Sequence, residues 1–275
     1  MNFVEVLKVL LFGIVEGFTE WLPISSTGHL ILVEQLVQLD QPESFWNVFK
    51  VVIQLGAILA VVLIYWEKLW PFSRSNTSAR KRGIISLWLK IAAACVPTAL
   101  IGLPLDMVLD DYLSSPVIIA AALIVYGVIF IVLENRNKNV IFPINSMKKL
   151  DYKTAVLIGL FQCLAFIPGT SRSGATILGA MILGCARPIA AEFSFYLGIP
   201  VMFGASLLKI VKHGFDFTGV QIFLLLFGMM TSFIVAVYTI RFLMKYIRKH
   251  DFKVFGYYRI VLGIIVLIYF LVLAR

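Results

Sequence analysis

Charged residues are scarce in this chain. Asp, Glu, Lys and Arg together make up only 14% of its 275 residues, whereas soluble domains carry about 25%. Hydrophobic residues make up 60%, and the mean hydropathy is +0.94. This composition excludes an ordinary soluble domain and predicts a protein embedded in a membrane.

Cysteine and histidine are also scarce, with three residues of each. The cysteines lack the spacing of a metal site or a disulfide framework, and all of them lie inside apolar segments (Cys95, Cys163 and Cys185). We interpret them as small buried hydrophobic residues. Two of the histidines lie in polar loops, which leaves His29 as the candidate for a chemical role.

Features of three other protein classes are absent. The N-terminus lacks a basic stretch and a small-residue cleavage site, so we expect no cleaved signal peptide. The G-x-x-x-x-G-K-[ST] pattern of nucleotide P-loops occurs nowhere. The formal charge of +9 comes from basic residues in short loops between apolar runs. This pattern favours contact with anionic lipid and argues against a nucleic-acid partner.

Six apolar segments are long enough to cross a bilayer. They cover residues 47–66, 84–103, 116–133, 188–208, 219–240 and 254–274. Two further regions, 3–39 and 154–185, consist of shorter or more charged apolar pieces that are interrupted near Pro23 and Pro168. Such pieces are typical of re-entrant hairpins. We therefore predict an all-α polytopic membrane protein with six transmembrane helices and two re-entrant helical hairpins.

Loop charges indicate the orientation of the chain. Loops 67–82, 134–153 and 241–253 each carry five basic residues, whereas loop 104–115 carries three aspartates and no basic residue. The positive-inside rule places the first three loops in the cytoplasm and the fourth outside the cell. Two lysines that this scheme places outside, Lys209 and Lys212, are an exception.

The two hairpins resemble each other in sequence. GIVEGFTEWLPISSTGH at residues 13–29 resembles GLFQCLAFIPGTSRSG at residues 159–174, with one gap and with SST aligned with TSR. Each hairpin precedes three crossings, so residues 1–133 and 154–275 form two repeats joined by a cytoplasmic linker, 134–153. Because three is odd, the second repeat enters the membrane in the opposite orientation, as in inverted-repeat transporters. Broken tips that meet at mid-membrane would expose N–H groups, which favour anions.

The first tip carries two carboxylates in apolar surroundings. Glu16 and Glu20 are four residues apart and share one face of a helix. An ordinary solvated face is the alternative, but the neighbours are Phe, Trp, Leu and Ile. A charge near the bilayer centre costs about 2.5–3.5 kcal/mol, so these carboxylates require a cation, a basic partner or a shared proton.

A hydroxyl-rich stretch with a histidine follows in the same tip. Ser25, Ser26 and Thr27 could serve only to cap a helix. His29, however, lies three residues after Ser26 and can approach its hydroxyl if a helix begins here. That pairing would allow general-base activation of the serine or proton donation to a leaving group.

The second tip carries one arginine among hydroxyl groups. Arg172 is flanked by Ser171 and Ser173, with Thr170 beside them. A guanidinium binds phosphate oxygens bidentately, and hydroxyl and free N–H groups supply further donors. The alternative is an arginine that contacts lipid headgroups. If the two tips meet, Arg172 also offsets the carboxylates of the first tip, and the combined site suits phosphoryl transfer.

Four motifs carry a resemblance to a known family: EGFTEWLPISSTGH, VVIQLGAILAVV (51–62), PGTSRSGAT and EFSFYLGIPVMFGAS (192–206). Together they resemble the bacterial undecaprenyl-diphosphate phosphatase family of the bacitracin-resistance type, over nearly the whole chain. The resemblance implies a plasma-membrane enzyme that removes the terminal phosphate of undecaprenyl diphosphate and so recycles the lipid carrier of cell-wall synthesis. It also implies a divalent cation, Mg²⁺ or Ca²⁺. SSTGH alone is similar to an element of acid-phosphatase-type lipid phosphatases, but the lysine that should accompany their Arg-Pro pair is missing.

The resemblance also implies roles for individual residues. Ser26 and His29 are the implied catalytic pair, and Glu16 and Glu20 match the E-x-x-x-E pattern of the family and are expected to hold the cation. The diphosphate is expected to be bound by an arginine and by hydroxyl groups of both tips (Arg172, Ser171, Ser173, Thr170, Thr27 and Ser25). Our hypothesis is that Ser26 or an activated water attacks the terminal phosphorus, with His29 as acid or base. The site should open to the extracytoplasmic side, where the first hairpin begins and ends.

Two other classes stay open at this point. A transporter or flippase of a polyprenyl phosphate would use the same inverted repeats and the same arginine, although it needs no nucleophile beside a base. A membrane scaffold leaves the buried charges unexplained. The expected partners are a polyprenyl diphosphate and membrane lipids; a homodimer is left open, and no nucleic acid is expected.

Overall fold

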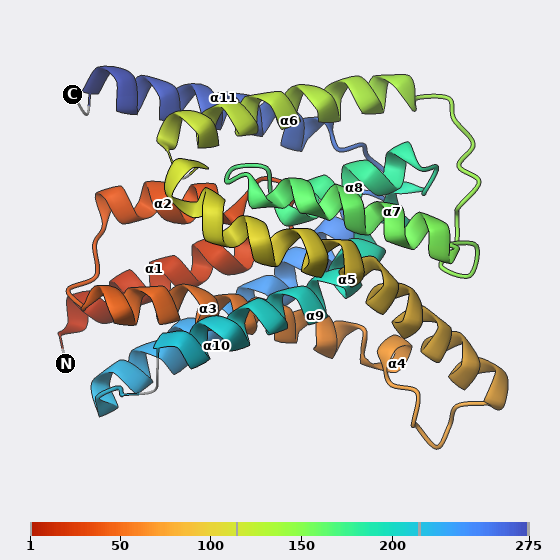
Figure 1. Ribbon diagram of the computed structural model, residues 1–275, viewed down its shortest axis with the longest axis horizontal. Coiled ribbons are helices and arrows are strands. Elements are labelled where there is room, and N and C mark those ends of the chain that lie inside the picture. The colour runs from red at the N-terminus through yellow and green to blue at the C-terminus, as the bar shows by residue number, and fades with distance from the viewer. Residues whose placement is uncertain (1, 114, 214–215, 274–275) are drawn as a thin grey trace.

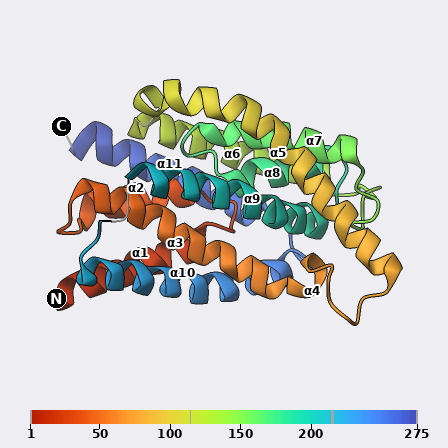
Figure 2. The same cartoon turned by 60° about the horizontal axis from the view of Figure 1, so that its bottom comes forward.

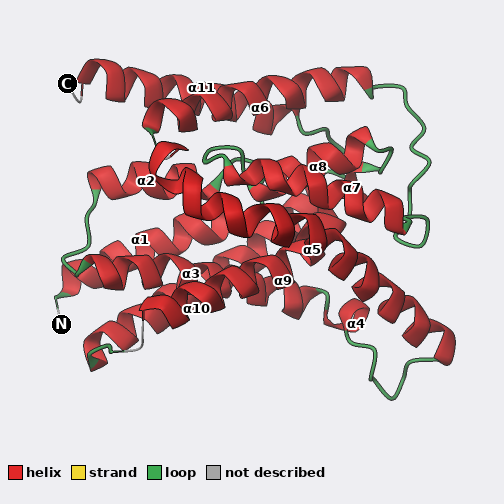
Figure 3. Cartoon of the chain, viewed as in Figure 1, coloured by secondary structure: helices red, strands yellow, loops and turns green. Residues whose placement is uncertain are grey.

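The computed structural model describes residues 2–113, 115–213 and 216–273, and the side chains of all of these except 102–113, 212–213 and 272–273. In this part of the chain every regular element is a helix, and one isolated bridge joins Ile144 to Cys185 (Figure 3). The helices lie side by side in one bundle (Figure 1). The prediction of an all-α protein is confirmed.

Within the described residues, six helices are long and apolar enough to cross a membrane. They are α3 (Glu43–Ile64, followed by the short α4, Trp66–Leu69), α5 (Ser78–Leu113), α6 (Pro116–Arg136), α9 (Arg187–His213), α10 (Gly219–Tyr246) and α11 (Lys253–Ile268, continued by η2, Tyr269–Leu273). Each overlaps one predicted segment, so the prediction of a polytopic membrane protein is confirmed. Large apolar side chains such as Leu63, Val132 and Met230 are exposed on these helices, where a membrane would offer them lipid.

Several helices extend beyond the predicted apolar segments. Helix α5 continues to Leu113, so the prediction of a loop at 104–115 is wrong for most of its length. Helix α10 continues to Tyr246 and helix α5 begins at Ser78, so parts of loops 241–253 and 67–82 are also helical. The apolar segments end at the predicted loop boundaries, but Leu, Met, Lys and Arg favour helix whether or not lipid surrounds them.

Two shorter helical pairs turn back within the bundle. Helix α1 (Phe3–Thr19) is followed by α2 (Ser26–Leu36), and α7 (Tyr152–Gln162) continues through the 3-10 turn η1 (Cys163–Phe166) and is followed by α8 (Arg172–Ile182). The first pair opens toward the end of the bundle that holds both termini, and the second pair opens toward the opposite end (Figure 1, Figure 2). Each turn contains a proline, which has no N–H group to continue a helix. Entry of the two pairs into the membrane from opposite sides stays a prediction.

The two halves of the chain interleave. Helix α1 packs against α10 and helix α7 against α5, so each hairpin lies against a long helix of the other half. Helix α3 contacts α9 and α10, and α6 packs along α11. Glycines allow the close approaches: a Cβ atom on Gly56 would lie 2.2 Å from the carbonyl oxygen of Met229, and one on Gly159 would lie 2.0 Å from that of Ala94. Neither half is therefore a separate packing unit, and their relation as inverted repeats stays a prediction.

The predicted basic loops all lie at the end of the bundle opposite the termini (Figure 1). Here Glu134 of α6 forms an ion pair with Arg187 of α9 and accepts a hydrogen bond from the backbone N–H of Phe252 (2.9 Å). In the linker, Asp151 caps α7 by accepting hydrogen bonds from Thr154, and these bonds hold the pKa of Asp151 below its ordinary value. The cytoplasmic location of this end stays a prediction of the positive-inside rule.

Gly56 offers a test of the packing between α3 and α10. Gly56→Ala places a methyl group 2.2 Å from the Met229 carbonyl oxygen, so the helices must shift and the protein should lose about 1–3 kcal/mol of stability. Gly204→Ala on α9 is the matched control, because a Cβ atom there meets nothing within 4 Å and alanine favours a helix. Thermal unfolding in detergent, followed by circular dichroism, measures both. Equal melting temperatures of the two variants would contradict this packing.

Candidate active site

The two hairpin tips share one unusual backbone conformation. Ser25 and Ser171 have φ angles of 74° and 71°, and they are the non-glycine residues with positive φ in the described part of the chain. Each is the N-cap of the helix that follows, and its hydroxyl accepts a hydrogen bond from the N–H group of a glycine three residues later, Gly28 (3.3 Å) or Gly174 (3.1 Å). Ser25 is thus equivalent to Ser171. The alignment of SST with TSR is therefore wrong by one residue, because sequence likeness alone could not locate the gap.

Hydrogen bonds hold the two tips together. Ser173 donates to the backbone carbonyl groups of Glu20 (3.2 Å) and Leu22 (3.1 Å) and is fully buried. Thr176, one turn later on α8, shares a hydrogen bond with Ser194 of α9 (2.6 Å). The structure therefore confirms that the tips meet, but Ser173 faces the backbone of the first tip.

Arg172 lies between the first tip and helix α9. Its guanidinium donates to the Glu20 carboxylate (3.2 Å) and to the backbone carbonyl of Ser194 (2.9 Å), and it lies 5.0 Å from the ring centre of Trp21. Gly198 leaves room for it, since a Cβ atom there would lie 2.8 Å from Nη1. The arginine of one tip is thus the charge partner of a carboxylate of the other.

Ser26 is hydrogen-bonded to a carboxylate rather than to a histidine. Its hydroxyl donates to Oε2 of Glu20 at 2.6 Å, while Oε1 of the same carboxylate accepts from Arg172. Among the described residues, the expected hydrogen bond between Ser26 and His29 is absent. The physical reason is that Ser26 is the first residue of α2, so its side chain can reach back to the end of the preceding segment.

His29 is held by two other partners. Its Nδ1 lies 2.7 Å from the carbonyl oxygen of Ser25, which can only accept, so Nδ1 carries the proton. Its Nε2 lies 2.6 Å from the hydroxyl of Tyr258 on α11 and accepts a hydrogen bond from it. The two rings are stacked, with centres 5.6 Å apart. Tyr258 could not be singled out from the sequence, because a tyrosine near a membrane boundary is common.

A polar cavity of about 100 Å³ lies between the tips. Its polar lining comes from both tips and from helix α3 (Glu20, Ser25, Ser26, Thr27, Ser171, Arg172 and Gln54). Four of the predicted site residues are not part of this lining (Glu16, His29, Thr170 and Ser173). Gln54 was missed, although it is the one polar residue within VVIQLGAILAVV.

Glu16, one helical turn before Glu20, is buried, with 1% of its surface exposed, and its Oε1 has no hydrogen-bond partner among the described residues. In the same part of the chain no group of three or more His, Cys, Asp or Glu side chains is placed to hold a metal. Two carboxylates are nevertheless enough for Mg²⁺ when a substrate phosphate and water complete the shell. The residues present fit a cation of that kind, with Glu16 as the carboxylate that has a free oxygen.

A second buried arginine, which we did not predict, ties the tips together. Arg259 of α11 is fully buried and donates to the backbone carbonyls of Pro23 (3.1 Å), Gly169 (2.8 Å), Thr170 (3.0 Å) and Leu123 (3.4 Å). It thus binds the backbone of both tips at once, and it has no carboxylate partner among the described residues. A lone arginine inside the apolar segment 254–274 was the signal that could have found it.

Replacement of Arg259 should destabilise the whole bundle. Arg259→Met leaves several buried carbonyl groups without donors, each at about 1–3 kcal/mol, so we expect a loss of at least about 3 kcal/mol. Arg241→Met on the exposed surface of α10 removes the same charge and should have little effect. Thermal unfolding of both variants in detergent measures this. A melting temperature of Arg259→Met close to that of Arg241→Met would refute the proposal that Arg259 stabilises the contact between the tips.

The comparisons with known proteins agree with this arrangement. A sequence model of a family described as "Bacitracin resistance protein BacA" matches residues 9–265. Proteins named undecaprenyl-diphosphatase from Acetivibrio thermocellus and Enterococcus faecalis are 57% and 55% identical to this chain, over 97% and 98% of it and 98% of each relative. A third with the same name, from Lachnoclostridium phytofermentans, is 54% identical over the full length of both chains. The chain therefore belongs to the BacA family of bacitracin-resistance proteins.

Proposed function

We propose that this protein is an integral-membrane phosphatase that hydrolyses undecaprenyl diphosphate to undecaprenyl phosphate and inorganic phosphate. Such a reaction returns the lipid carrier to cell-wall synthesis and confers resistance to bacitracin. The observation that carries the proposal is the hydrogen bond from Ser26 to Glu20 beside Arg172, inside a polar cavity between two helix tips. Family membership and the names of the relatives point to the same activity.

Substrate binding rests on the second tip. Arg172 has an Nε–H without a partner among the described residues, and its guanidinium borders the cavity, so it is available to phosphate oxygens. Ser171, Ser25 and Thr27 line the same space. The N-termini of α2 and α8 meet there, and helix N-termini favour anions. Ser173 and Thr170 then contribute by holding the tips in place.

The chemical step begins with Ser26. Its hydroxyl attacks the terminal phosphorus, the bond from phosphorus to the bridging oxygen breaks, and undecaprenyl phosphate leaves. Glu20, which already accepts the hydrogen bond from this hydroxyl at 2.6 Å, takes the proton. A water then attacks the phosphoserine and gives its proton to the pair formed by His29 and Tyr258. The bond from phosphorus to the serine oxygen breaks, the serine oxygen takes back the proton held by Glu20, and inorganic phosphate leaves with Ser26 restored.

His29 acts at the border of the site in this scheme. Its Nε2 faces the Tyr258 hydroxyl, so the pair can give a proton to the departing lipid phosphate in the first step and take one from the attacking water in the second. Its Nδ1–H donates a hydrogen bond to the carbonyl of Ser25 and thereby stabilises the strained turn before the nucleophile. We keep His29 as the acid or base of the second step and assign the first deprotonation to Glu20.

A divalent cation, Mg²⁺ or Ca²⁺, is part of the proposal. Around the tips, the two buried carboxylates, Glu16 and Glu20, are matched in number by two arginines, Arg172 and Arg259, of which Arg172 is ion-paired with Glu20. A diphosphate therefore brings excess negative charge into an apolar bundle, where it needs compensation. Glu16 would be the main protein ligand and Glu20 a shared one, and the cation would neutralise charge on the phosphate oxygens.

A carrier or flippase is not favoured. The relatives are named as diphosphatases, and a carrier has no use for a serine hydroxyl bonded to a carboxylate. The protein is a multi-pass membrane protein. We further propose that the site opens to the extracytoplasmic side, the side on which the first hairpin begins and ends.

Substitutions at the tips test the reaction. Ser26→Ala and Arg172→Ala should lower kcat at least about 1,000-fold, and Glu20→Gln or His29→Ala about 100- to 10,000-fold. Phosphate release from purified protein in detergent, with no membrane gradient, is the measurement. Ser75→Ala in an exposed loop is the control and should retain full activity. Near-normal phosphate release by all three of the single variants at Ser26, His29 and Arg172 would refute the assignment of these residues to the active site.

Metal removal tests the cation. Treatment with EDTA should abolish phosphate release, and added Mg²⁺ or Ca²⁺ should restore it. Glu16→Gln should raise the cation concentration needed for half-maximal activity by at least about tenfold, whereas Glu43→Gln at the exposed start of α3 should leave it unchanged. Full activity in EDTA would refute the cation without touching the role of Ser26.

A further inference from the structure

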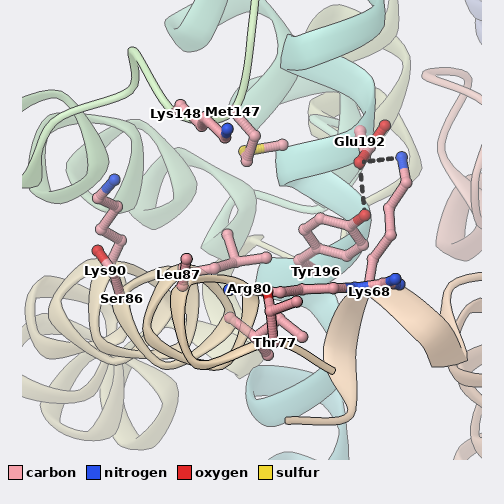
Figure 4. Close-up of a pocket in the computed structure, with 13 residues that line it drawn as sticks. Lys68, Thr77, Arg80, Ser86, Leu87, Lys90, Met147, Lys148, Glu192 and Tyr196 are labelled. Carbon is pink, nitrogen blue, oxygen red and sulfur yellow. Dashed lines mark hydrogen bonds and ion pairs between the residues drawn. The ribbon is translucent and has the colours of Figure 1, made fainter. Parts of the chain in front are cut away.

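A second cavity, of about 640 Å³, lies at the end of the bundle that carries the basic loops (Figure 4). Its walls come from three parts of the chain: α4 with the first half of α5, the linker at residues 147–148, and the beginning of α9. It shares no lining residue with the cavity between the tips. The proposed phosphatase reaction leaves this space without a role.

Four cations and a single carboxylate line the cavity (Lys68, Arg80, Lys90, Lys148 and Glu192). Glu192 is already satisfied: it accepts from Lys68 at 2.9 Å and from the hydroxyl of Tyr196 at 2.5 Å, on one side of the cavity (Figure 4). The carboxylate and Lys68 therefore compensate each other, and the positive charge of the cavity comes from the other three residues.

Those three cations are weakly compensated or not compensated at all. Arg80 donates to the carbonyl of Glu67 (3.0 Å) and lies 3.9 Å from its carboxylate, but both side chains are exposed, so this pair contributes little. Lys90 lies 5.8 Å from the ring centre of Tyr152. Within the described residues, neither Lys90 nor Lys148 has a carboxylate partner. Both face the same cavity, on the side away from Glu192 (Figure 4).

The remaining lining suits a ligand that is both anionic and apolar. Thr77 and Ser86 offer hydroxyl donors near the cations, whereas Ile84, Leu87 and Met147 form an apolar wall. The apolar part of α5 begins at this level, so the cavity lies where a membrane surface would meet the bundle. Lysine stems lie along apolar surface while their ammonium groups stay at the polar edge.

We propose that this cavity binds a phosphate group, as carried by the headgroup of an anionic phospholipid. Basic pockets between helices at the cytoplasmic surface bind such headgroups, and lysine binds phosphate as a point charge. Lys90 and Lys148 supply the charge for the phosphodiester, Thr77 and Ser86 supply hydrogen bonds, and the apolar wall receives the start of an acyl chain. The site is separate from the phosphatase site and does not depend on it.

Native mass spectrometry of the full chain in detergent tests the proposal. The probes are phosphatidylglycerol, phosphatidylcholine of the same chain length, and inorganic phosphate. The double variant Lys90→Gln/Lys148→Gln is compared with Lys149→Gln/Lys153→Gln, which removes the same charge from exposed residues of the linker that do not line the cavity. Circular dichroism verifies that both variants are folded, and phosphate release should be unchanged in both.

Wild type and the control should retain one phosphatidylglycerol at least tenfold more tightly than phosphatidylcholine, and the cavity variant should lose that preference. Competition by inorganic phosphate at millimolar concentration would identify free phosphate as a ligand of the same site, and its failure to compete would identify the lipid headgroup. Retention of phosphatidylglycerol by the cavity variant, or an equal loss in the control, would overturn the proposal, because surface charge alone would then explain binding.

Discussion

The ion pair between Glu20 and Arg172 is the interaction on which the site depends. It joins two helix tips that are 152 positions apart in the sequence, and both side chains are almost fully buried. Removal of one partner from such a pair leaves an uncompensated buried charge, which costs about 3–5 kcal/mol. Each tip can therefore hold its charge in an apolar bundle only because the other tip is there. The same contact places Ser26, bonded to the other oxygen of Glu20, next to the guanidinium.

Broken helices impose a second constraint, because they leave backbone groups without partners where no bulk water is near. Arg259 of α11 supplies the missing partners. Its guanidinium donates hydrogen bonds to backbone carbonyl groups of both tips, at Pro23, Gly169 and Thr170. Its neighbour Tyr258 holds His29. Two consecutive residues of the last long helix thus fix both the backbone of the turns and the orientation of the histidine. The interleaved packing of the halves brings that helix to the tips.

The sequence could predict the features that depend on local composition or on the need of buried charges for partners. The six long helices follow from apolar runs, and the meeting of the tips follows from the need of Glu16, Glu20 and Arg172 for one another. Uncharged hydrogen-bond partners that lie far away in the chain, such as Tyr258, could not be predicted. Spacing of three suggested a bond between Ser26 and His29, but the partner of His29 is 229 positions away and that of Ser26 lies before the helix begins.

The two tips differ in their proposed roles because different residues occupy one pair of equivalent positions, the position after Ser25 and the position after Ser171. Ser25 and Ser171 adopt the same strained φ, at about 1–3 kcal/mol each, and both cap the helix that follows with their hydroxyl. Glycine would relieve the strain but has no hydroxyl group to cap the helix. The need for this N-cap hydrogen bond therefore explains a serine at each of these positions. The next residue is Ser26 in one tip and Arg172 in the other. Because both turns border the same cavity, a small hydroxyl at one position and a long guanidinium at the other line it together, each hydrogen-bonded to one oxygen of Glu20. One kind of turn, used twice, thus supplies both the proposed nucleophile and the group that binds the phosphate.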